Sequence, residues 1–315
     1  MKSSRSAMAL AAALLALAAN TVAGAQGASG QHWTVNAGGL SPDHTIDAQV
    51  FAPTIIVVDA GDTITWSGVG HTVLFTPAGK RVPVIIPDPK GQGMIDNPEV
   101  FAPQGGKTYT GEGIAGSGLL TPQNASYSLT FTKAGVYRYL CGLHPGMRGT
   151  VVVQPAGTPY PHTPAEYAAI AKQELQAAFD GGKQALAQAA KPYVLPGPNG
   201  TKTYEIWAGI GTSSATADLY VPATLTIHLG DTVVWTQPDP HELHSVTFTS
   251  GAKDTPADNA PHGGHTYTGV EHLSSGLMGP DQRYALTFTK AGTFHYSCTI
   301  HDTVGMEGTI VVLPN

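Results

Sequence analysis

The chain of 315 residues repeats itself, and this repeat constrains its fold more than any other feature. Identical or nearly identical segments recur in the same order in both halves, at Gly61–Trp66 and Gly230–Trp235, Gln104–Gly111 and His262–Gly269, and Leu129–Gly135 and Leu286–Gly292. Two copies are too few for a solenoid array, in which at least three repeats stack. The sequence therefore predicts two similar domains in tandem.

Each copy has the pattern of an all-β domain. Short β-branched runs such as Thr54–Val58, Thr63–Trp66 and Tyr127–Phe131 alternate with turn signals, and only 12% of residues are charged, while 38 are Gly and 24 are Pro. Short strands at this spacing are typical of two antiparallel sheets packed face to face. We expect an all-β protein with two tandem Greek-key β-sandwich domains joined by a helical linker.

The ends of the copies suggest four segments. Residues 1–25 resemble a secretory signal peptide, because Lys2 and Arg5 precede an apolar run and Ala23–Ala25 offers a cleavage site. We expect a first domain at 26–154, a Pro-rich and helical linker at 155–202 and a second domain at 203–315. The protein should then be periplasmic or extracellular, and no later apolar stretch is long enough for a membrane span.

The linker has a helical pattern. Thr163–Glu166 matches a capping box with proline at the first helical position, and apolar residues from Tyr167 to Phe179 recur at helical spacing. Gly181 and Gly182 are expected to break the helix, with a short second segment from Lys183 to Lys191. The first copy also has about fifteen extra residues within 79–103, which we expect either to cap a site or to form a partner surface.

Both copies contain the donor set of a copper site. One thiolate, two imidazoles and a thioether make a type 1 (blue) copper centre, with His and Cys in a trigonal plane and a weak axial Met. The two predicted ligand sets are His71, Cys141, His144 and Met147, and His244, Cys298, His301 and Met306. Two cysteines in an exported protein also suggest a disulfide, but equivalent positions in separate sandwiches lie too far apart for one.

On these motifs, both halves resemble the cupredoxins, the plastocyanin/azurin-like copper proteins. The resemblance implies copper near one end of each sandwich and one-electron transfer through the exposed edges of His144 and His301. Backbone N–H groups of Leu143 and Ile300 are expected to bond the cysteine sulfurs, and loops of unequal length should give unequal midpoint potentials. Redox partner proteins are implied.

The charge balance limits the partners. The formal net charge is −6, or about −8 once Lys2 and Arg5 leave with the signal peptide, since −6 − 2 = −8. An acidic surface argues against nucleic acid as a partner. A homo-oligomer remains open on the sequence alone.

Two other functions stay open. Two-domain cupredoxin chains also occur as copper nitrite reductases and small laccases, but these have His beside the copper cysteine, where this chain has Leu140 and Gly142, and Ser297 and Thr299. A copper-delivery protein is the third alternative. An extra metal site in the second domain would favour an enzyme, and its candidate ligands are His241, His262, His265 and His272.

Overall fold

A computed structural model describes residues 30–91, 94–189 and 191–315. The predicted signal peptide lies outside these residues. Within them, none of the helices has the length and apolar character needed to cross a membrane.

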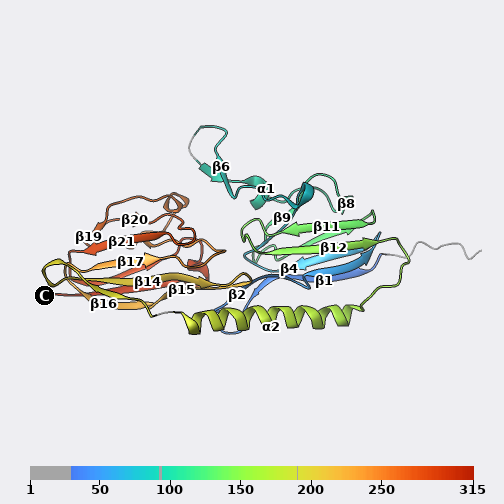
Figure 1. Cartoon of the computed structure of the whole chain (residues 1–315). Coiled ribbons are helices and arrows are strands. Elements are labelled where there is room, and N and C mark those ends of the chain that lie inside the picture. Colours follow the sequence, from blue (N-terminus) through green and yellow to red (C-terminus); the bar gives the residue numbers. More distant parts are fainter. Residues whose placement is uncertain (1–29, 92–93, 190) are drawn as a thin grey trace, which may run out of the picture.

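The first half is a sandwich of two sheets (Figure 1). One sheet contains β1 (His32–Leu40), β2 (Asp47–Ala52), β4 (Thr63–Ser67), β10 (Ser126–Phe131) and β8 (Thr108–Tyr109). The facing sheet contains β3 (Ile55–Asp59), β12 (Arg148–Gln154), β11 (Gly135–Leu140), β5 (Thr72–Phe75) and β9 (Ala115–Leu119). The core between them is built on Trp66, whose ring centroid lies 5.4 Å from that of Tyr139.

The second half repeats this sandwich strand for strand. One sheet contains β14 (Lys202–Gly211), β15 (Ala215–Val221), β17 (Thr232–Thr236), β21 (Arg283–Phe288) and β19 (Thr266–Tyr267), with β13 (Val194–Pro196) beside β14. The other contains β16 (Thr224–His228), β23 (Glu307–Leu313), β22 (Gly292–Ser297), β18 (Thr247–Phe248) and β20 (Leu273–Ser274). Trp235 and Tyr296 pack at 5.2 Å, as Trp66 and Tyr139 do, so the prediction of two tandem cupredoxin-like sandwiches is confirmed.

The two sandwiches share one sheet. Strand β2 pairs antiparallel with β15, with Ala48 opposite Ala215 and Asp47 opposite Thr216. This pairing merges one sheet of each half into a single sheet of eleven strands that crosses the domain junction. Backbone hydrogen bonds therefore fix how the two domains sit end to end (Figure 1).

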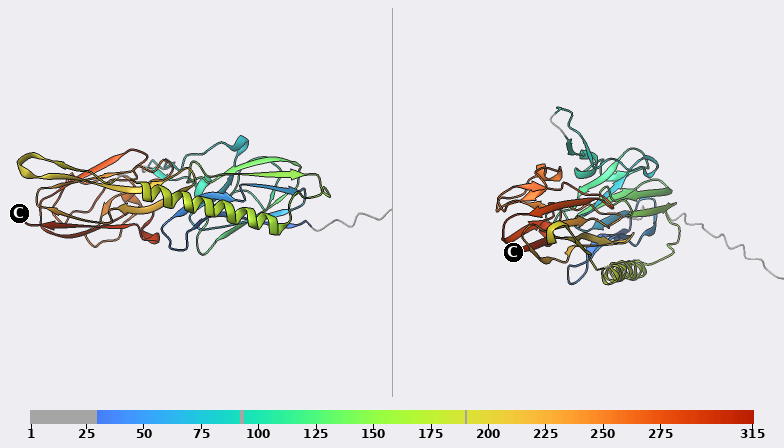
Figure 2. Two further views of the ribbon diagram at one scale, coloured as in Figure 1. Left: turned by 60° about the horizontal axis from the view of Figure 1, so that its bottom comes forward. Right: turned by 60° about the vertical axis from the view of Figure 1, so that its left-hand side comes forward.

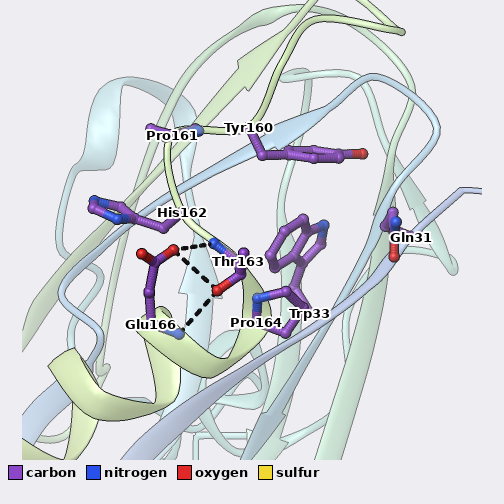
Figure 3. A pocket seen from close by; sticks show the side chains of 8 residues that line it. All are labelled: Gln31, Trp33, Tyr160, Pro161, His162, Thr163, Pro164 and Glu166. Atoms are coloured by element: carbon purple, nitrogen blue, oxygen red, sulfur yellow. Dashed lines mark hydrogen bonds between the residues drawn. The ribbon is translucent and has the colours of Figure 1, made fainter.

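A long helix, α2 (Pro164–Gln188), lies along the first half and reaches across the junction to the second (Figure 2). Its start has the predicted capping box: Thr163 Oγ1 accepts from the Glu166 N–H, and a Glu166 carboxylate oxygen accepts from the Thr163 N–H at 2.7 Å. Figure 3 shows these bonds beside Trp33 and Tyr160, which line a cavity of about 330 Å³ at the start of the helix. The helix packs on β2 and β15, across the junction.

The prediction that Gly181 and Gly182 break this helix is wrong. The helix is continuous through both residues, and the Gly182 Cα approaches the junction so closely that a Cβ there would lie 2.6 Å from Ile46 Cγ2 and 3.2 Å from Ala215 Cβ. Glycine disfavours a helix by only about 1 kcal/mol, which tertiary packing readily offsets. Gly182 thus serves close packing rather than termination.

The extra segment of the first half covers one end of its own sandwich. It forms the hairpin β6 (Ile85–Pro87) and β7 (Met94–Asp96), then the short helix α1 (Pro98–Phe101), above the domain junction (Figure 1). Arg81 donates to the Gly142 carbonyl at 2.8 Å, and Val100 packs against Gly142. Two roles were expected for this segment, and these contacts support the first, which is to cap the first candidate site.

Four 3₁₀ turns complete the described elements: η1 (Pro77–Gly79), η2 (Pro198–Gly200), η3 (Pro256–Asn259) and η4 (Asp302–Val304).

Candidate metal centres

The first candidate centre lies on the loop between β11 and β12. Cys141 directly follows β11, and its N–H donates to the Met147 carbonyl at 3.0 Å. The Met147 N–H in turn donates to the His144 carbonyl at 3.2 Å, which closes the loop into a tight turn. Three of the four predicted ligands are therefore placed by one short loop.

The fourth predicted ligand, His71, directly precedes β5, in the same sheet as β11. Its ring lies against the backbone of Gly38, where an added Cβ would overlap the imidazole. Gly38 has a φ of +71°, so this position requires glycine for both its backbone conformation and the approach of the ring. The ring is completely buried, which fixes its orientation.

The donor atoms of the first centre converge. His71 Nδ1 and His144 Nδ1 lie 2.9 Å apart, and Cys141 Sγ lies 3.5 Å from His144 Nδ1. Donors bound at about 2.0–2.3 Å to one ion are separated by roughly 3.4–3.8 Å, so the set needs only a slight expansion to hold a metal. Two imidazole nitrogens and a thiol facing one point are the donors that a copper ion prefers.

The second centre repeats this arrangement. His244 Nδ1 and His301 Nδ1 lie 3.2 Å apart, and Cys298 Sγ lies 3.5 Å from His301 Nδ1. Gly209 approaches the His244 ring as Gly38 approaches that of His71. Both thiols are free and buried, each in the core of its own half. The residues present fit a copper ion in both halves.

Both axial candidates are buried beside their cysteines. Met147 and Met306 lie in the same core clusters as Cys141 and Cys298. The Cys298 N–H donates to the Met306 carbonyl at 3.1 Å, which repeats the loop closure of the first centre. A thioether ligand to each centre is therefore compatible with the loop path.

The hydroxyl residue after each upstream histidine organises the cysteine. The Thr72 and Ser245 N–H groups donate to the sulfurs of Cys141 and Cys298, at 3.4 Å and 3.3 Å. Their hydroxyls accept from the N–H of the residue after the cysteine, at 2.7 Å for Gly142 and 2.9 Å for Thr299.

The backbone donors to sulfur are thus not the residues we expected. In the part of the chain that the structure describes, they come from Thr72 and Ser245 instead of Leu143 and Ile300. The signal in the sequence was the hydroxyl residue directly after the upstream histidine, present in both copies.

The electrostatics of each centre favour a thiolate. Burial alone would raise the pKa of the Cys141 thiol, but His144 and His71 hold this pKa well below its ordinary value. The pKa of Cys298 is lowered in the same way against the effect of its burial, by His301 and His244. The thiolate is the form that binds a metal ion.

An acidic residue from the second half lies against the histidine of the first. His144 Nε2 is 2.9 Å from one carboxylate oxygen of Glu242, and His301 Nε2 is 3.9 Å from the other. The loop histidines of both centres therefore meet at one buried carboxylate at the domain junction. The expectation of an exposed His144 edge is wrong, because this side chain is 6% exposed and faces the other domain.

Further contacts hold Glu242 in place. Gln49 of β2 donates to the same carboxylate oxygen that faces His144, at 2.7 Å. Burial would raise the pKa of Glu242, but His144 and, more weakly, His301 and His244 hold it well below its ordinary value. Sequence reasoning missed Glu242 because its role depends on the orientation of the domains. The only local signal was an acidic residue two positions before His244, where the first copy has Val69.

A cleft of about 770 Å³ opens between the domains above this carboxylate. Apolar and acidic side chains from both halves line it, among them Leu143, His144, Asp218, Glu242, Ile300 and His301. Burial raises the pKa of Asp218, although His301 and His244 act in the opposite direction. The cleft gives both centres a common approach from outside.

The four histidines predicted as an extra site do not all meet. His262 and His272 lie together with Asp258, while His265 bonds the Ala285 carbonyl at 3.1 Å. His241 lies at the domain junction, where a Cβ on Gly146 of the first cysteine loop would be 3.7 Å from its ring. The structure therefore brings together two of the four candidate ligands, His262 and His272, leaves His241 and His265 apart from them, and adds Asp258, which sequence reasoning omitted.

Comparisons with known proteins agree with this architecture. The family model for copper binding proteins of the plastocyanin/azurin family matches residues 40–154 and 210–313. An amicyanin from Paracoccus denitrificans is 34% identical over 95 residues, which cover 30% of this chain and 57% of the amicyanin. A plastocyanin from Scenedesmus fuscus is 31% identical over 112 residues, 34% of this chain and 89% of the plastocyanin.

Among solved structures, a Cu(I) form of an amicyanin variant is similar at 30% identity, with 31% of this chain and 72% of that chain covered and a TM-score of 0.22. A purple cupredoxin from Nitrosopumilus maritimus is 21% identical, with 35% and 98% covered and a TM-score of 0.25. Because the family model matches well over half of the residues, in two separate regions, the chain belongs to the plastocyanin/azurin family of copper-binding proteins.

Proposed function

We propose that this chain is an exported electron carrier with two type 1 copper centres, one in each domain of the predicted division 26–154 and 203–315. The observation that carries the proposal is the convergence of one thiol and two imidazole nitrogens in both halves. His71, Cys141 and His144 would hold the first ion with Met147 as the axial ligand. His244, Cys298 and His301 would hold the second with Met306. Copper, when bound, supplies reversible one-electron chemistry.

The protein's own part is to keep each donor set rigid. Buried rings, the closed loop and the hydroxyls of Thr72 and Ser245 hold the donors with little freedom to move. Supporting bonds of this kind tune the potential of a metal centre. A fixed donor set suits electron transfer, because the geometry changes little between the two oxidation states.

We further propose that the two centres exchange electrons across the domain junction. Glu242 lies between the loop histidines of opposite domains, so a short route of side chains joins the two donor sets. The route from the first centre to a redox partner would then run through the junction or the cleft, since His144 is buried. The second centre, with the more exposed loop, would meet the partner protein directly.

The enzyme alternative has no comparable support at these two centres. In both loops the residues flanking the cysteine lack the histidine that joins a type 1 copper to a catalytic copper in nitrite reductases and laccases. A copper-delivery function would need an ion that exchanges readily, whereas the cysteine and the upstream histidine of both donor sets are buried. The carrier is therefore the function that the geometry supports best.

The test is a reductive titration of the copper-loaded protein with metal analysis and visible spectroscopy. We expect two copper ions per chain, an intense blue absorption, and its complete loss after two electron equivalents. A colourless protein with bound copper would rule out the proposal. One electron equivalent per chain would restrict it to a single centre.

A further inference from the structure

Outside the two centres above, one more group of metal-binding side chains converges within the described residues. Asp258 Oδ1 lies 2.8 Å from His262 Nε2 and 2.8 Å from His272 Nε2. The two imidazole rings have centroids 5.4 Å apart. Three donor atoms therefore face one point, as they do in the copper centres, but this set contains no sulfur.

The carboxylate of this group is fixed in position. Asp258 is 1% exposed, and its other oxygen, Oδ2, accepts from the Thr255 N–H at 2.6 Å and from the Thr255 hydroxyl at 3.1 Å. The Asp258 carbonyl accepts from the Ser274 hydroxyl at 2.7 Å. Oδ1 is thereby aimed at the two imidazoles by bonds that do not involve them.

The histidines come from separate segments that the backbone holds together. His262 forms a two-way backbone bridge with Ser274, at 3.0 and 3.1 Å, and His272 directly precedes β20. Their side chains are 37% and 35% exposed, so an ion and its water ligands can reach the nitrogens from solvent. Burial would raise the pKa of Asp258, but bonds from His262 and Thr255 lower it overall, which keeps the carboxylate ionised.

The first half provides an internal comparison. The repeated segments Gln104–Gly111 and His262–Gly269 place Val100, Gln104 and Ile114 opposite Asp258, His262 and His272. None of these three can supply an imidazole or a carboxylate. The group is therefore specific to the second half, although the fold around it is shared.

We infer that Asp258, His262 and His272 form a third metal site, which binds a borderline divalent ion such as Zn²⁺ with water completing its shell. Imidazole nitrogen with carboxylate oxygen suits Zn²⁺, and three protein ligands with an open position are typical of accessible zinc sites. Copper(II) is held by similar donors, so a titration in which Zn²⁺ and Cu²⁺ compete for the site shows which of the two ions it prefers. In the structure both Nε2 atoms bond to the Asp258 carboxylate, so each imidazole carries its proton on Nε2, and this proton must move to Nδ1 before Nε2 can bind an ion.

The experiment uses the full chain already loaded with copper, titrated with Zn²⁺ in a calorimeter while the blue absorption is recorded. We expect one Zn²⁺ per chain and no loss of blue colour. Substitution His262→Gln installs the residue of the first half and should raise the Kd at least about 100-fold, because even supporting partners of metal ligands contribute 10–100-fold. His272→Ile, which likewise installs the first-half residue, should do the same.

His265→Lys is the matched control, because Lys107 occupies this place in the first half and His265 bonds the Ala285 carbonyl instead of the group. This variant should bind Zn²⁺ as the unaltered protein does. Absence of binding, an unchanged Kd in both His262→Gln and His272→Ile, or bleaching in step with the heat would each overturn the inference. Anomalous scattering at the zinc edge should give a peak between Asp258, His262 and His272. A peak elsewhere would also contradict the inference.

Discussion

The two cysteine loops carry the same donors but differ in what covers them. In the first, two residues separate His144 from Met147, and Glu242 covers the histidine from one side while the segment around Arg81 and Val100 covers the loop from another. In the second, four residues separate His301 from Met306 and form the turn η4. Ile300 and Val304 of that loop remain about 40% exposed.

This difference shows how a duplicated domain can acquire two roles without a change of ligands. The residues that enclose the first loop are not conserved between the halves: Val69 corresponds to Glu242, Val100 corresponds to Asp258, and most of the segment 79–103 has no counterpart in the second half. The donor set thus determines which ion binds, and the covering residues determine which partner can approach it. We expect an inner centre in the first half and an outer centre in the second.

The largest effect should come from removing one thiolate at a time. Cys141→Ser and Cys298→Ser should each abolish one centre and halve the blue absorption per chain, because serine oxygen does not replace a soft sulfur ligand. Visible spectra with copper analysis test this. If one variant kept the full absorption and the other lost all of it, only one of the two donor sets would bind copper as a blue centre.

Glu242→Gln should raise the midpoint potential of the first centre more than that of the second. Glu242 lies 2.9 Å from the predicted ligand His144, and a negative charge in contact with a ligand contributes roughly 1–2 kcal/mol, or on the order of 50–100 mV for one electron, in favour of the oxidised ion. The effect should be smaller at the second centre, because Glu242 lies farther from His301 than from His144. Potentiometric titration of each Cys→Ser background measures both values.

The exposed residue Glu112 offers a matched control for this change, since Glu112→Gln alters the net charge equally and Glu112 is not among the residues that line the cleft. Equal shifts at both centres in Glu242→Gln would show that Glu242 acts through net charge alone. Intramolecular electron transfer, followed after pulsed reduction, should slow in Glu242→Gln and not in Glu112→Gln.

Val304→Asp should slow electron exchange with an external partner by about tenfold, and only through the second centre. A charge on an apolar contact surface disfavours docking by roughly 1–2 kcal/mol. Stopped-flow oxidation of the reduced protein measures the rate in each Cys→Ser background. A similar loss at the first centre would mean that both centres use the same docking surface.

The smallest expected effect is the pH dependence of the free energy of unfolding that the junction contributes in the copper-free protein. The pKa of Glu242 is lowered in the folded protein, so ionised Glu242 stabilises the fold fully at a pH above the ordinary pKa of 4.5. This stabilisation is lost as the pH falls. His144 has a raised pKa despite its burial, because of Glu242 and Cys141, so its contribution is complete below 6.5 and is lost as the pH rises.

The contact between Glu242 and His144 should therefore stabilise most between about pH 4.5 and 6.5, by about 1 kcal/mol relative to pH 8. Denaturant unfolding of the copper-free protein across this range measures it. Glu242→Gln should flatten the dependence, and an equally steep dependence in that variant would contradict the assignment.

The parts of this molecule that the sequence predicts are those carried by short segments. The repeat predicts both sandwiches, and the spacing from Cys141 to Met147 places three donors on one loop wherever that loop lies. The junction is different, because Glu242, Gln49 and Gly182 act across elements far apart in the chain. The Gly181–Gly182 pair shows the limit clearly, since local propensity predicts a break and packing against Ile46 keeps the helix whole.

The pairing of β2 with β15 has a consequence for the chain cut in two. Each half produced alone would expose an unpaired strand edge, with the small residues Ala48 or Ala215 offering no obstacle to a neighbouring backbone. An unpaired edge can pair with a strand of another molecule, so an isolated half should self-associate. The strand pairing that β2 and β15 make within the intact chain would then form between two molecules. Because both halves belong to one chain, their association does not depend on the protein concentration.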